Sequence, residues 1–372
     1  HHRDLHSFPT RRSSDLIEQW LREKIDVDPD GQFNERSSSI YSPLTDRCLI
    51  TIARLLNRPE LLEPVRRNLN MTLYFVHPDG EVVTEASRRQ DQYQRGSMAR
   101  YYYPYRYLAL HDANGEFAAM ARWIETTSMD KLAQELIFFQ EDPDLGRDMA
   151  AGKPLPENYR RVFAWSHLAR IRRRQVSATV LARNSIFFTF HKGAAALEGM
   201  RFAAAFFGKG QFVGEELREE NGVFIMTHSM EGPYYQPYPV EELPADGDWE
   251  KMDRGKRPRS QVQHLTSRVE ISEKEGVCSI SVTITGTDRV PVAVELGFRK
   301  GGQLEQVTPL AADTYLLAAG TGRYSYAGQT IQFGPGLAEH RWTQIRGSQP
   351  KLDALSVYLT GYTPFRHELV VQ

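Results

Sequence analysis

The chain has 372 residues, a formal net charge of −1 and two cysteines. This length is sufficient for two domains with substantial cores. A charge so close to zero produces no overall field toward nucleic acid or an anionic membrane, so we expect neither as a partner. No apolar run approaches the length of a transmembrane helix.

Cys48 and Cys278 lie far apart in the sequence, Cys48 in a helical pattern and Cys278 in a strand pattern. Both fall on apolar faces, which predicts two buried free thiols. Their spacing gives neither a disulfide framework nor a metal-ligand motif, so we expect no metal site and no cofactor. This cysteine usage is compatible with the cytoplasm and with export.

Residues 1–16, HHRDLHSFPTRRSSDL, differ from the rest of the chain. They are rich in Arg and Ser and lack the apolar core of a signal peptide. They resemble a translated sequencing adapter, and we interpret them as an artefactual leader fused to a gene fragment. On this interpretation the natural N-terminus, with any signal peptide, lies upstream of Ile17 and is missing.

Residues 17–174 have the apolar periodicity of helices. Ser42 is predicted to cap a helix that opens with Pro43. Four side chains are then expected on its buried face: Leu44, Cys48, Ile52 and Leu55. Further helices are predicted at about 59–73, 97–111, 115–126, 129–139 and 157–172. The pattern indicates antiparallel helical hairpins, either a solenoid or part of a closed (α/α) toroid.

From residue 175 the apolar period changes to two, which is typical of strands. Apolar residues alternate with others in 176–182, 278–284 and 292–298, and glycine-rich turns separate such runs. Residues 239–260 are predicted to form an exposed loop. The fold class is therefore α+β with two domains: an incomplete (α/α) toroid over 17–174 and an antiparallel β-sandwich over 175–372.

A short pattern occurs twice in the helical half. Pro29-Asp30-Gly31 and Pro78-Asp79-Gly80 are turn sequences 49 residues apart. Each is followed by Glu-x-Ser, beginning at Glu35 and Glu85, and then by a tyrosine, Tyr41 and Tyr93. We expect both loops at the same end of the helical domain, where loops on a rigid scaffold supply binding residues.

The first copy resembles a motif of the heparinase II/III-like and alginate-lyase-like polysaccharide lyases. Residues 30–37, with Tyr41 next, match the family's D-G-x-x-x-E-x-S…Y segment. The motif covers about fifteen residues, whereas the resemblance in architecture covers roughly 17–372. It implies that Tyr41 acts near the scissile bond and that His191, matched by context, reaches the cleft from the β domain. The family's Asn-His pair, which neutralises the substrate carboxylate, has no counterpart after Ile17.

The residue types in these loops suit β-elimination on a uronate. A base removes the proton beside the carboxylate, and donors stabilise the charge that develops. A tyrosine can exchange that proton, and an arginine can hold a carboxylate through two hydrogen bonds. The candidate substrate-binding residues are the polar side chains of both loops and one tyrosine of the following helix: Glu35, Arg36, Glu85, Arg88, Gln90, Asp91, Tyr93 and Tyr101.

The predicted function is a lyase acting on a uronate-containing glycan, with an anionic or neutral polysaccharide as the partner. One alternative is a glycoside hydrolase that uses Glu35 and Glu85 as its acid and base pair. Another is a non-catalytic glycan-binding protein. Tyr41 is also compatible with a packing role. His191 lies on the strand face opposite Phe188 and Phe190 and is also compatible with a structural role. The sequence does not give the sugar, the linkage or the oligomeric state.

Overall fold

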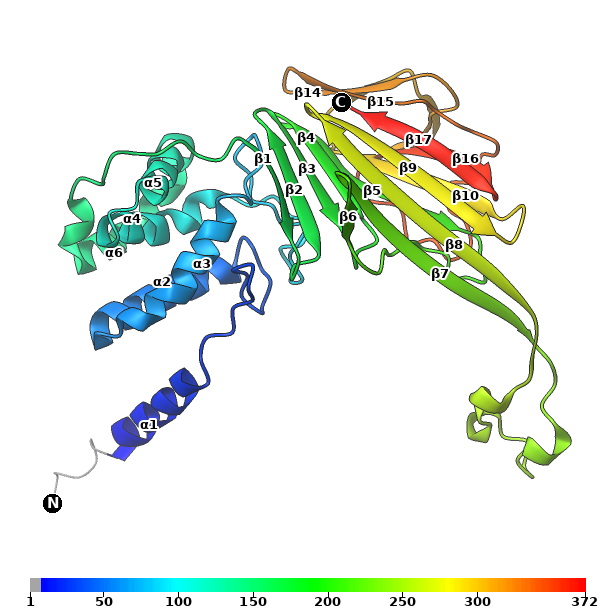
Figure 1. The fold of residues 1–372 in the computed structure, drawn as a ribbon, viewed down its shortest axis with the longest axis horizontal. Coiled ribbons are helices and arrows are strands. Elements are labelled where there is room, and N and C mark those ends of the chain that lie inside the picture. Colours follow the sequence, from blue (N-terminus) through cyan, green and yellow to red (C-terminus); the bar gives the residue numbers. More distant parts are fainter. Residues whose placement is uncertain (1–7) are drawn as a thin grey trace. The chain divides into compact units, whose positions relative to one another are not determined.

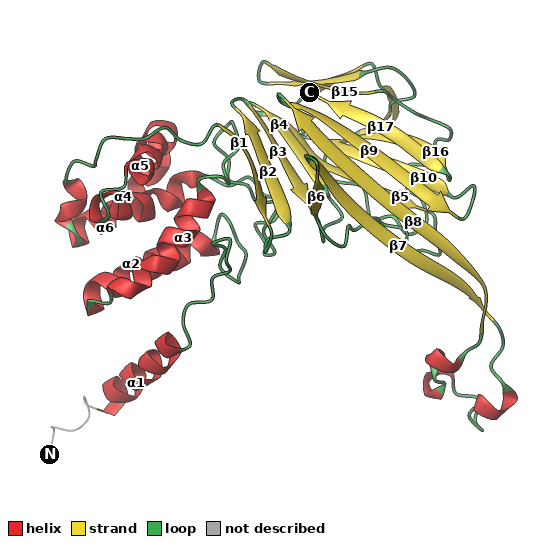
Figure 2. Ribbon diagram, viewed as in Figure 1, coloured by secondary structure: helices red, strands yellow, loops and turns green. Residues whose placement is uncertain are grey.

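The computed structural model describes residues 8–372 (Figure 1). These residues form two compact units that divide between Glu157 and Asn158. The first unit is mainly helical and the second consists mainly of strands (Figure 2), which is the predicted α+β organisation. Residues 1–7 of the predicted leader lie outside the described residues, whereas residues 8–16 belong to the first helix, α1.

The helical unit consists of six α-helices and four short 3₁₀ helices within the described residues. Helices α2 and α3 form one hairpin, and α4 and α5 form a second. The α-helices are α1 (Phe8–Arg22), α2 (Tyr41–Leu56), α3 (Leu62–Thr72), α4 (Tyr102–His111), α5 (Gly115–Ser128) and α6 (Leu136–Glu141). The 3₁₀ helices are η1 (Pro59–Leu61), η2 (Met98–Tyr101), η3 (Met129–Glu135) and η4 (Pro143–Gly146).

One hydrophobic core holds the helical hairpins together. The segment predicted as a helix at 59–73 contributes an apolar stripe to this core, because Leu61, Val65, Leu69 and Leu73 are all buried. Four of the five tyrosines between 101 and 107 are buried in this unit as well, and the fifth is half-buried. Three of their hydroxyl groups donate hydrogen bonds within the unit; Tyr105, for example, donates a 2.8 Å hydrogen bond to the Leu69 carbonyl.

The buried face predicted for α2 is wrong. Leu44 and Leu55 are 50% and 67% exposed, and Cys48 is also exposed. The buried face is instead made of Ser42, Pro43, Asp46, Leu49, Ile50 and Ala53. Apolar residues occupy both faces of this helix, so periodicity alone does not identify the inner one. Ser42 is not the cap either: Ile40 holds that position, and the Ser37 hydroxyl accepts the Tyr41 N–H.

The helix predicted at 157–172 is also wrong. This segment forms two antiparallel strands, β1 (Asn158–Phe163) and β2 (Leu168–Arg173). In β2, Ala169 and Ile171 join the core of the second unit and alternate with Arg170 and Arg172. That alternation has a period of two, which requires a strand when only one face is apolar.

The second unit contains two large sheets. One has nine strands in the order β1-β2-β3-β4-β5-β10-β16-β13-β12, and the other has eight in the order β11-β14-β15-β17-β9-β8-β7-β6. The remaining strands are β3 (Val176–Leu181), β4 (Phe188–Lys192), β5 (Ala195–Ala204), β6 (Arg218–Glu220), β7 (Val223–Tyr235), β8 (Arg259–Lys274), β9 (Val277–Gly286), β10 (Pro291–Phe298), β11 (Gln303–Glu305), β12 (Thr308–Ala311), β13 (Thr314–Leu316), β14 (Gly322–Tyr326), β15 (Gln329–Gly334), β16 (Leu355–Tyr362) and β17 (Phe365–Val371).

The predicted strand periodicity is confirmed. The alternating apolar residues of 176–182, 278–284 and 292–298 contribute to a single core that takes side chains from both sheets. Cys278 is buried in this core, as predicted. Strands β7 and β8 form a long hairpin that extends beyond the rest of the unit (Figure 1). Its tip contains the predicted exposed loop 239–260 with three short 3₁₀ helices. Within residues 8–372, no helix has the length and apolar character needed to span a membrane.

Candidate functional site

The two Pro-Asp-Gly segments form the same turn. Each closes a small antiparallel bridge, between Val27 and Phe33 in the first copy and between Val76 and Val82 in the second. The backbone hydrogen bonds also repeat at 49 residues. Asp28 donates to the Gln32 carbonyl at 2.9 Å and His77 to the Glu81 carbonyl at 2.8 Å. Both turns are therefore confirmed as a structural repeat.

Gly31 is required at the first turn. Its φ is +105°, and an added Cβ would lie 2.4 Å from the Arg67 carbonyl oxygen on α3. The Asn68 side chain donates a 2.9 Å hydrogen bond to the Gly31 carbonyl. Helix α3 therefore fixes the first loop through its backbone.

The two loops lie side by side and pair in a register of 49 residues. The Ser38 N–H donates to the Ser87 hydroxyl at 2.9 Å, and Gln90 Nε2 donates to the Tyr41 hydroxyl at 3.0 Å. In this register Gln90, not Tyr93, corresponds to Tyr41. The Glu-x-Ser segments are offset by one residue, so their apparent equivalence in the sequence does not hold in the structure.

Asp91 joins the two loops. One of its carboxylate oxygens accepts the Ser39 N–H at 2.9 Å, the Ser39 hydroxyl at 3.1 Å and the Ser87 hydroxyl at 3.1 Å. The side chain is buried. Charge-assisted hydrogen bonds of this kind are among the stronger ones in proteins. Asp91 therefore serves as the main cross-link between the loops, a role that the sequence did not indicate.

Tyr41 is the first residue of α2 and lies at the junction of the loops. Besides the Gln90 hydrogen bond, the Arg89 guanidinium lies over its ring at 5.5 Å from the centroid. Arg89 is in turn 3.5 Å from a carboxylate oxygen of Glu35. The cation beside Tyr41 is thus Arg89 and not Arg36, which pairs with Asp28 at 3.6 Å.

The remaining predicted binding residues lie in different surroundings. Arg88 is exposed, and its N–H donates to the Arg36 carbonyl at 2.7 Å. Tyr93 is also exposed. Tyr101 is only 1% exposed, and its hydroxyl donates a 2.6 Å hydrogen bond to the Ser38 carbonyl. Burial raises the pKa of Tyr101 well above its usual value. It is therefore a structural donor beneath the first loop, which corrects its expected contact with a substrate.

Glu85 does not occupy a position like that of Glu35. His77 Nε2 lies 3.3 Å from Glu85 Oε1, so the two side chains form a pair across the second turn. His77 was not among the predicted site residues, although it directly precedes Pro78-Asp79-Gly80 in the sequence. A histidine beside a carboxylate is a common arrangement for proton transfer or for orienting the ring.

His191 lies on β4 in the second unit. Its neighbours across the sheet are Ser177 on β3 and Ala196 on β5. Phe188 and Phe190 of the same strand are part of the core, and His191 lies on the opposite face, as its parity predicted. Its expected position in a cleft stays a prediction.

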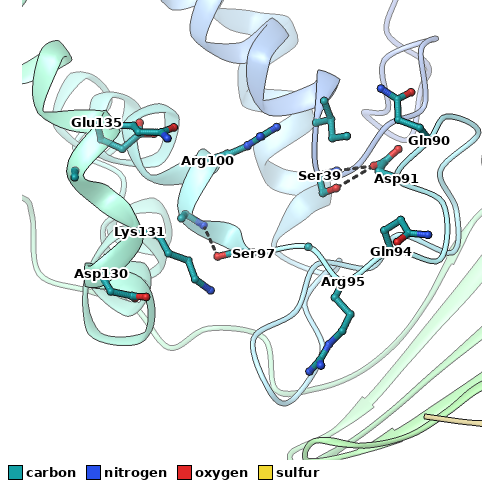
Figure 3. Close-up of a pocket in the computed structure, with 15 residues that line it drawn as sticks. Ser39, Gln90, Asp91, Gln94, Arg95, Ser97, Arg100, Asp130, Lys131 and Glu135 are labelled. Carbon is teal, nitrogen blue, oxygen red and sulfur yellow. Dashed lines mark hydrogen bonds between the residues drawn. The ribbon is translucent and has the colours of Figure 1, made fainter. Parts of the chain in front are cut away.

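A cleft of about 520 Å³ opens beside the paired loops in the helical unit (Figure 3). Its lining comes from both loops, from η2 and from η3. The polar and charged residues that line it are Ser39, Gln90, Asp91, Gln94, Arg95, Ser97, Arg100, Asp130, Lys131, Gln134 and Glu135. A volume of this size is typical of sites for small ligands or short sugar chains. Gln90 lines the cleft and also contacts Tyr41. The Tyr41 hydroxyl is therefore separated from the cleft by the Gln90 side chain alone.

Comparisons with known proteins give a likeness in fold. No protein-family model matches the sequence, and no curated protein matches it. The heparan sulfate lyase HepC from Pedobacter heparinus is similar in structure, with a TM-score of 0.50 and 9% sequence identity over 98% of this chain and 56% of that chain. A heparinase III gene product gives a TM-score of 0.47 and 11% identity over 98% of this chain and 55% of that chain.

The chain therefore spans about half the length of the solved structures it matches. At 9% identity, the similarity to HepC concerns the fold alone. The expected likeness to alginate lyases and the adapter interpretation of residues 1–16 stay predictions. The fold of this chain, helical hairpins followed by two large sheets, is heparinase-like.

Proposed function

We propose that this protein is a polysaccharide lyase that cleaves a uronate-containing glycan by β-elimination, with Tyr41 as the proton-exchanging residue. The observation that carries the proposal is the Tyr41 hydroxyl, which accepts a hydrogen bond from Gln90 beside a polar cleft, with Arg89 against its ring. The heparinase-like fold is consistent with this chemistry. We also propose that the helical hairpins are part of an (α/α) toroid. The predicted boundary at 174/175 is corrected to 157/158, because β1 and β2 belong to the nine-stranded sheet.

In the proposed reaction, a base takes the proton from the carbon beside the uronate carboxylate. The bond to the leaving oxygen then breaks, a carbon–carbon double bond forms in the uronate ring, and the leaving oxygen receives a proton. Tyr41 can take part because Gln90 Nε2 donates to its oxygen, which leaves the phenolic proton available and also stabilises a phenolate. The exposed Arg88 and Arg89 are candidates for holding the carboxylate. His191 is proposed as the contribution of the β unit.

The glutamate pair required by the hydrolase alternative has less support. Glu35 forms an ion pair with Arg89, whereas Glu85 lies against His77. In the 49-residue register Glu35 corresponds to Thr84, so the repeat does not place the two carboxylates symmetrically. A glycosidase needs two carboxyl groups that flank one bond.

The test is the Tyr41→Phe variant assayed on a panel of uronate glycans, with the ultraviolet absorbance of the unsaturated uronate as readout. We expect turnover to fall by about 10²- to 10⁴-fold, the usual contribution of general acid–base catalysis. The free energy of unfolding should change by less than about 1 kcal/mol, because only one half-exposed hydrogen bond is lost. Tyr234→Phe is the matched control, since Tyr234 is an exposed tyrosine near the end of β7 in the second unit. Retained turnover together with a large loss of stability would instead assign Tyr41 a packing role.

A further inference from the structure

The charges that line the cleft differ in whether they already have a partner. Arg95 pairs with Glu81 at 2.5 Å, and Glu135 pairs with Arg47. One oxygen of Asp91 accepts three hydrogen bonds from the loops. By contrast, the side chains of Arg100 and Lys131 form no ion pair or hydrogen bond with any of residues 15–372, whose side chains the structure describes. Arg100 interacts with the Glu135 carboxylate only through its charge, without an ion-pair contact. Neither cation is therefore held by a direct contact, and both can bind a ligand.

The side chain of Arg100 can bind a ligand, whereas its backbone is held in place by hydrogen bonds. Arg47 donates two hydrogen bonds to the Arg100 carbonyl, from Nε at 3.1 Å and from Nη2 at 2.8 Å. The Arg47 guanidinium also forms an ion pair with the buried carboxylate of Glu135. Its Cζ lies 5.7 Å from the centroid of the Phe138 ring. A backbone held in this way limits the conformational entropy that Arg100 loses when it binds a ligand. Lys131 extends from η3 on the same side of the cleft (Figure 3).

The opposite side of the cleft carries amide groups. Gln90 and Gln94 lie there on the second loop (Figure 3). The amides can donate to and accept from sugar hydroxyl groups. The carboxylates of Asp91 and Asp130 also line the cleft and repel an anion placed next to them. The cleft is therefore polarised, with its available cations on one side and hydroxyl-binding groups on the other.

We propose that this cleft is a subsite for an anionic sugar unit, whose carboxylate or sulfate binds Arg100 and Lys131 and whose hydroxyl groups bind Gln90 and Gln94. The identity of the ligand as a glycan rests on the proposed function. Because Gln90 also contacts Tyr41, a chain with its scissile bond at Tyr41 continues directly into this subsite. Arg100 binds an oxyanion with two parallel hydrogen bonds, and Lys131 adds a point charge.

The experiment measures binding by calorimetry in a Tyr41→Phe background, so that turnover does not interfere. The probes are a tetrasaccharide of alternating glucuronate and N-acetylglucosamine, the same tetrasaccharide with its carboxyl groups reduced to alcohols, and a sulfated derivative. Arg100→Gln combined with Lys131→Gln should weaken binding of the anionic probes at least tenfold, and Lys131→Arg should retain most of the affinity. Binding of the reduced probe should change less than twofold. Lys153→Gln, an exposed lysine of the same unit, is the matched control and should change nothing.

Each outcome decides the proposal. If the double variant loses affinity for the carboxylate probe or for the sulfated probe alone, the proposal is supported and the anionic group is identified. The proposal is overturned if the double variant loses as much affinity for the reduced probe as for the anionic ones, or if it loses none. It is also overturned if the parent binds none of the probes. The two proposals also fail separately. If the protein binds the anionic probes selectively but forms no unsaturated product, the subsite proposal stands and the lyase proposal fails. If the protein is an active lyase and the double variant has an unchanged KM, the lyase proposal stands and the subsite proposal fails.

Discussion

At the residue scale, Asp91 is the side chain on which the geometry around Tyr41 depends most. It is buried, and one oxygen accepts three hydrogen bonds from Ser39 and Ser87. We expect Asp91→Ala to lower the free energy of unfolding by about 2 to 4 kcal/mol, because several buried donors lose their acceptor. Urea unfolding monitored by circular dichroism measures this. Asp130→Ala, at an exposed carboxylate of the same cleft, should cost less than about 0.5 kcal/mol, and equal losses would contradict the cross-linking role.

Asp46 gives a prediction about pH. It is fully buried on α2, and neither carboxylate oxygen has a hydrogen-bond partner among residues 15–372. Burial raises its pKa well above the usual value, and the opposing effect of Arg47 is smaller. The folded chain therefore binds this proton more tightly than the unfolded chain, and stability falls as pH rises from the unfolded pKa toward the folded one.

The corresponding variant is Asp46→Asn, which keeps the shape and removes the ionisation. We expect it to be about 1 to 3 kcal/mol more stable than the parent at pH 7 and equally stable near pH 3. Thermal unfolding across this pH range measures the difference. A variant that loses stability at pH 7 would show that Asp46 is ionised and satisfied in the folded chain.

The motif predicted Tyr41 as the central residue, but the contacts around it were only partly predictable. Aligning the repeat on Glu-x-Ser and tyrosine made Tyr93 the equivalent of Tyr41. The backbone hydrogen bonds of the turns set a strict 49-residue register instead, and this brings Arg89 and Gln90 to Tyr41. Arg100 and Lys131 carry no local signal in the sequence, because the cleft exists only after η2 and η3 pack beside the loops.

At the element scale, α2 shows what periodicity can and cannot determine. The helix itself was predicted, but its buried face was not, because leucines occur on both sides. We expect Leu49→Ala to cost about 2 to 5 kcal/mol, since it empties a buried site. Leu44→Gln, on the exposed side, should cost less than about 0.5 kcal/mol and should reduce any self-association through this face. Chemical denaturation and light scattering measure the two effects, and a costly Leu44→Gln would restore the originally predicted face.

The error at β1 and β2 has a different origin. The four arginines between 170 and 174 are typical of the solvated end of a helix, and that composition concealed the alternation of Ala169 and Ile171 with Arg170 and Arg172. The structure pairs the segment with β3, which extends the nine-stranded sheet. In segments rich in long charged side chains, the period of the few apolar residues is therefore more informative than the charge pattern. The runs at 278–284 and 292–298 were read correctly because their intervening residues are mostly short or apolar.

At the scale of the whole molecule, the change of period in the sequence predicted two units, and each unit has a hydrophobic core of its own. Large apolar cores of this kind normally make a unit unfold cooperatively. The two cysteines are divided between the units, one in each. They differ in accessibility: Cys48 is exposed on α2, and Cys278 is buried in the strand core. Burial also raises the pKa of the Cys278 thiol to about 12.

These two thiols make the stability of the second unit measurable in the intact chain. A disulfide reagent at pH 8 should modify one thiol per native chain, because the thiolate is the reacting species and Cys278 is both inaccessible and protonated. The second thiol should react only as urea unfolds the sheets, in step with the loss of their circular dichroism signal. In Cys48→Ser the first reaction should disappear while the second remains unchanged. If both thiols of the parent reacted rapidly without urea, β9 would not be part of a closed core. If the second reaction instead preceded the loss of the sheet signal, strand β9 would open locally before the unit unfolds.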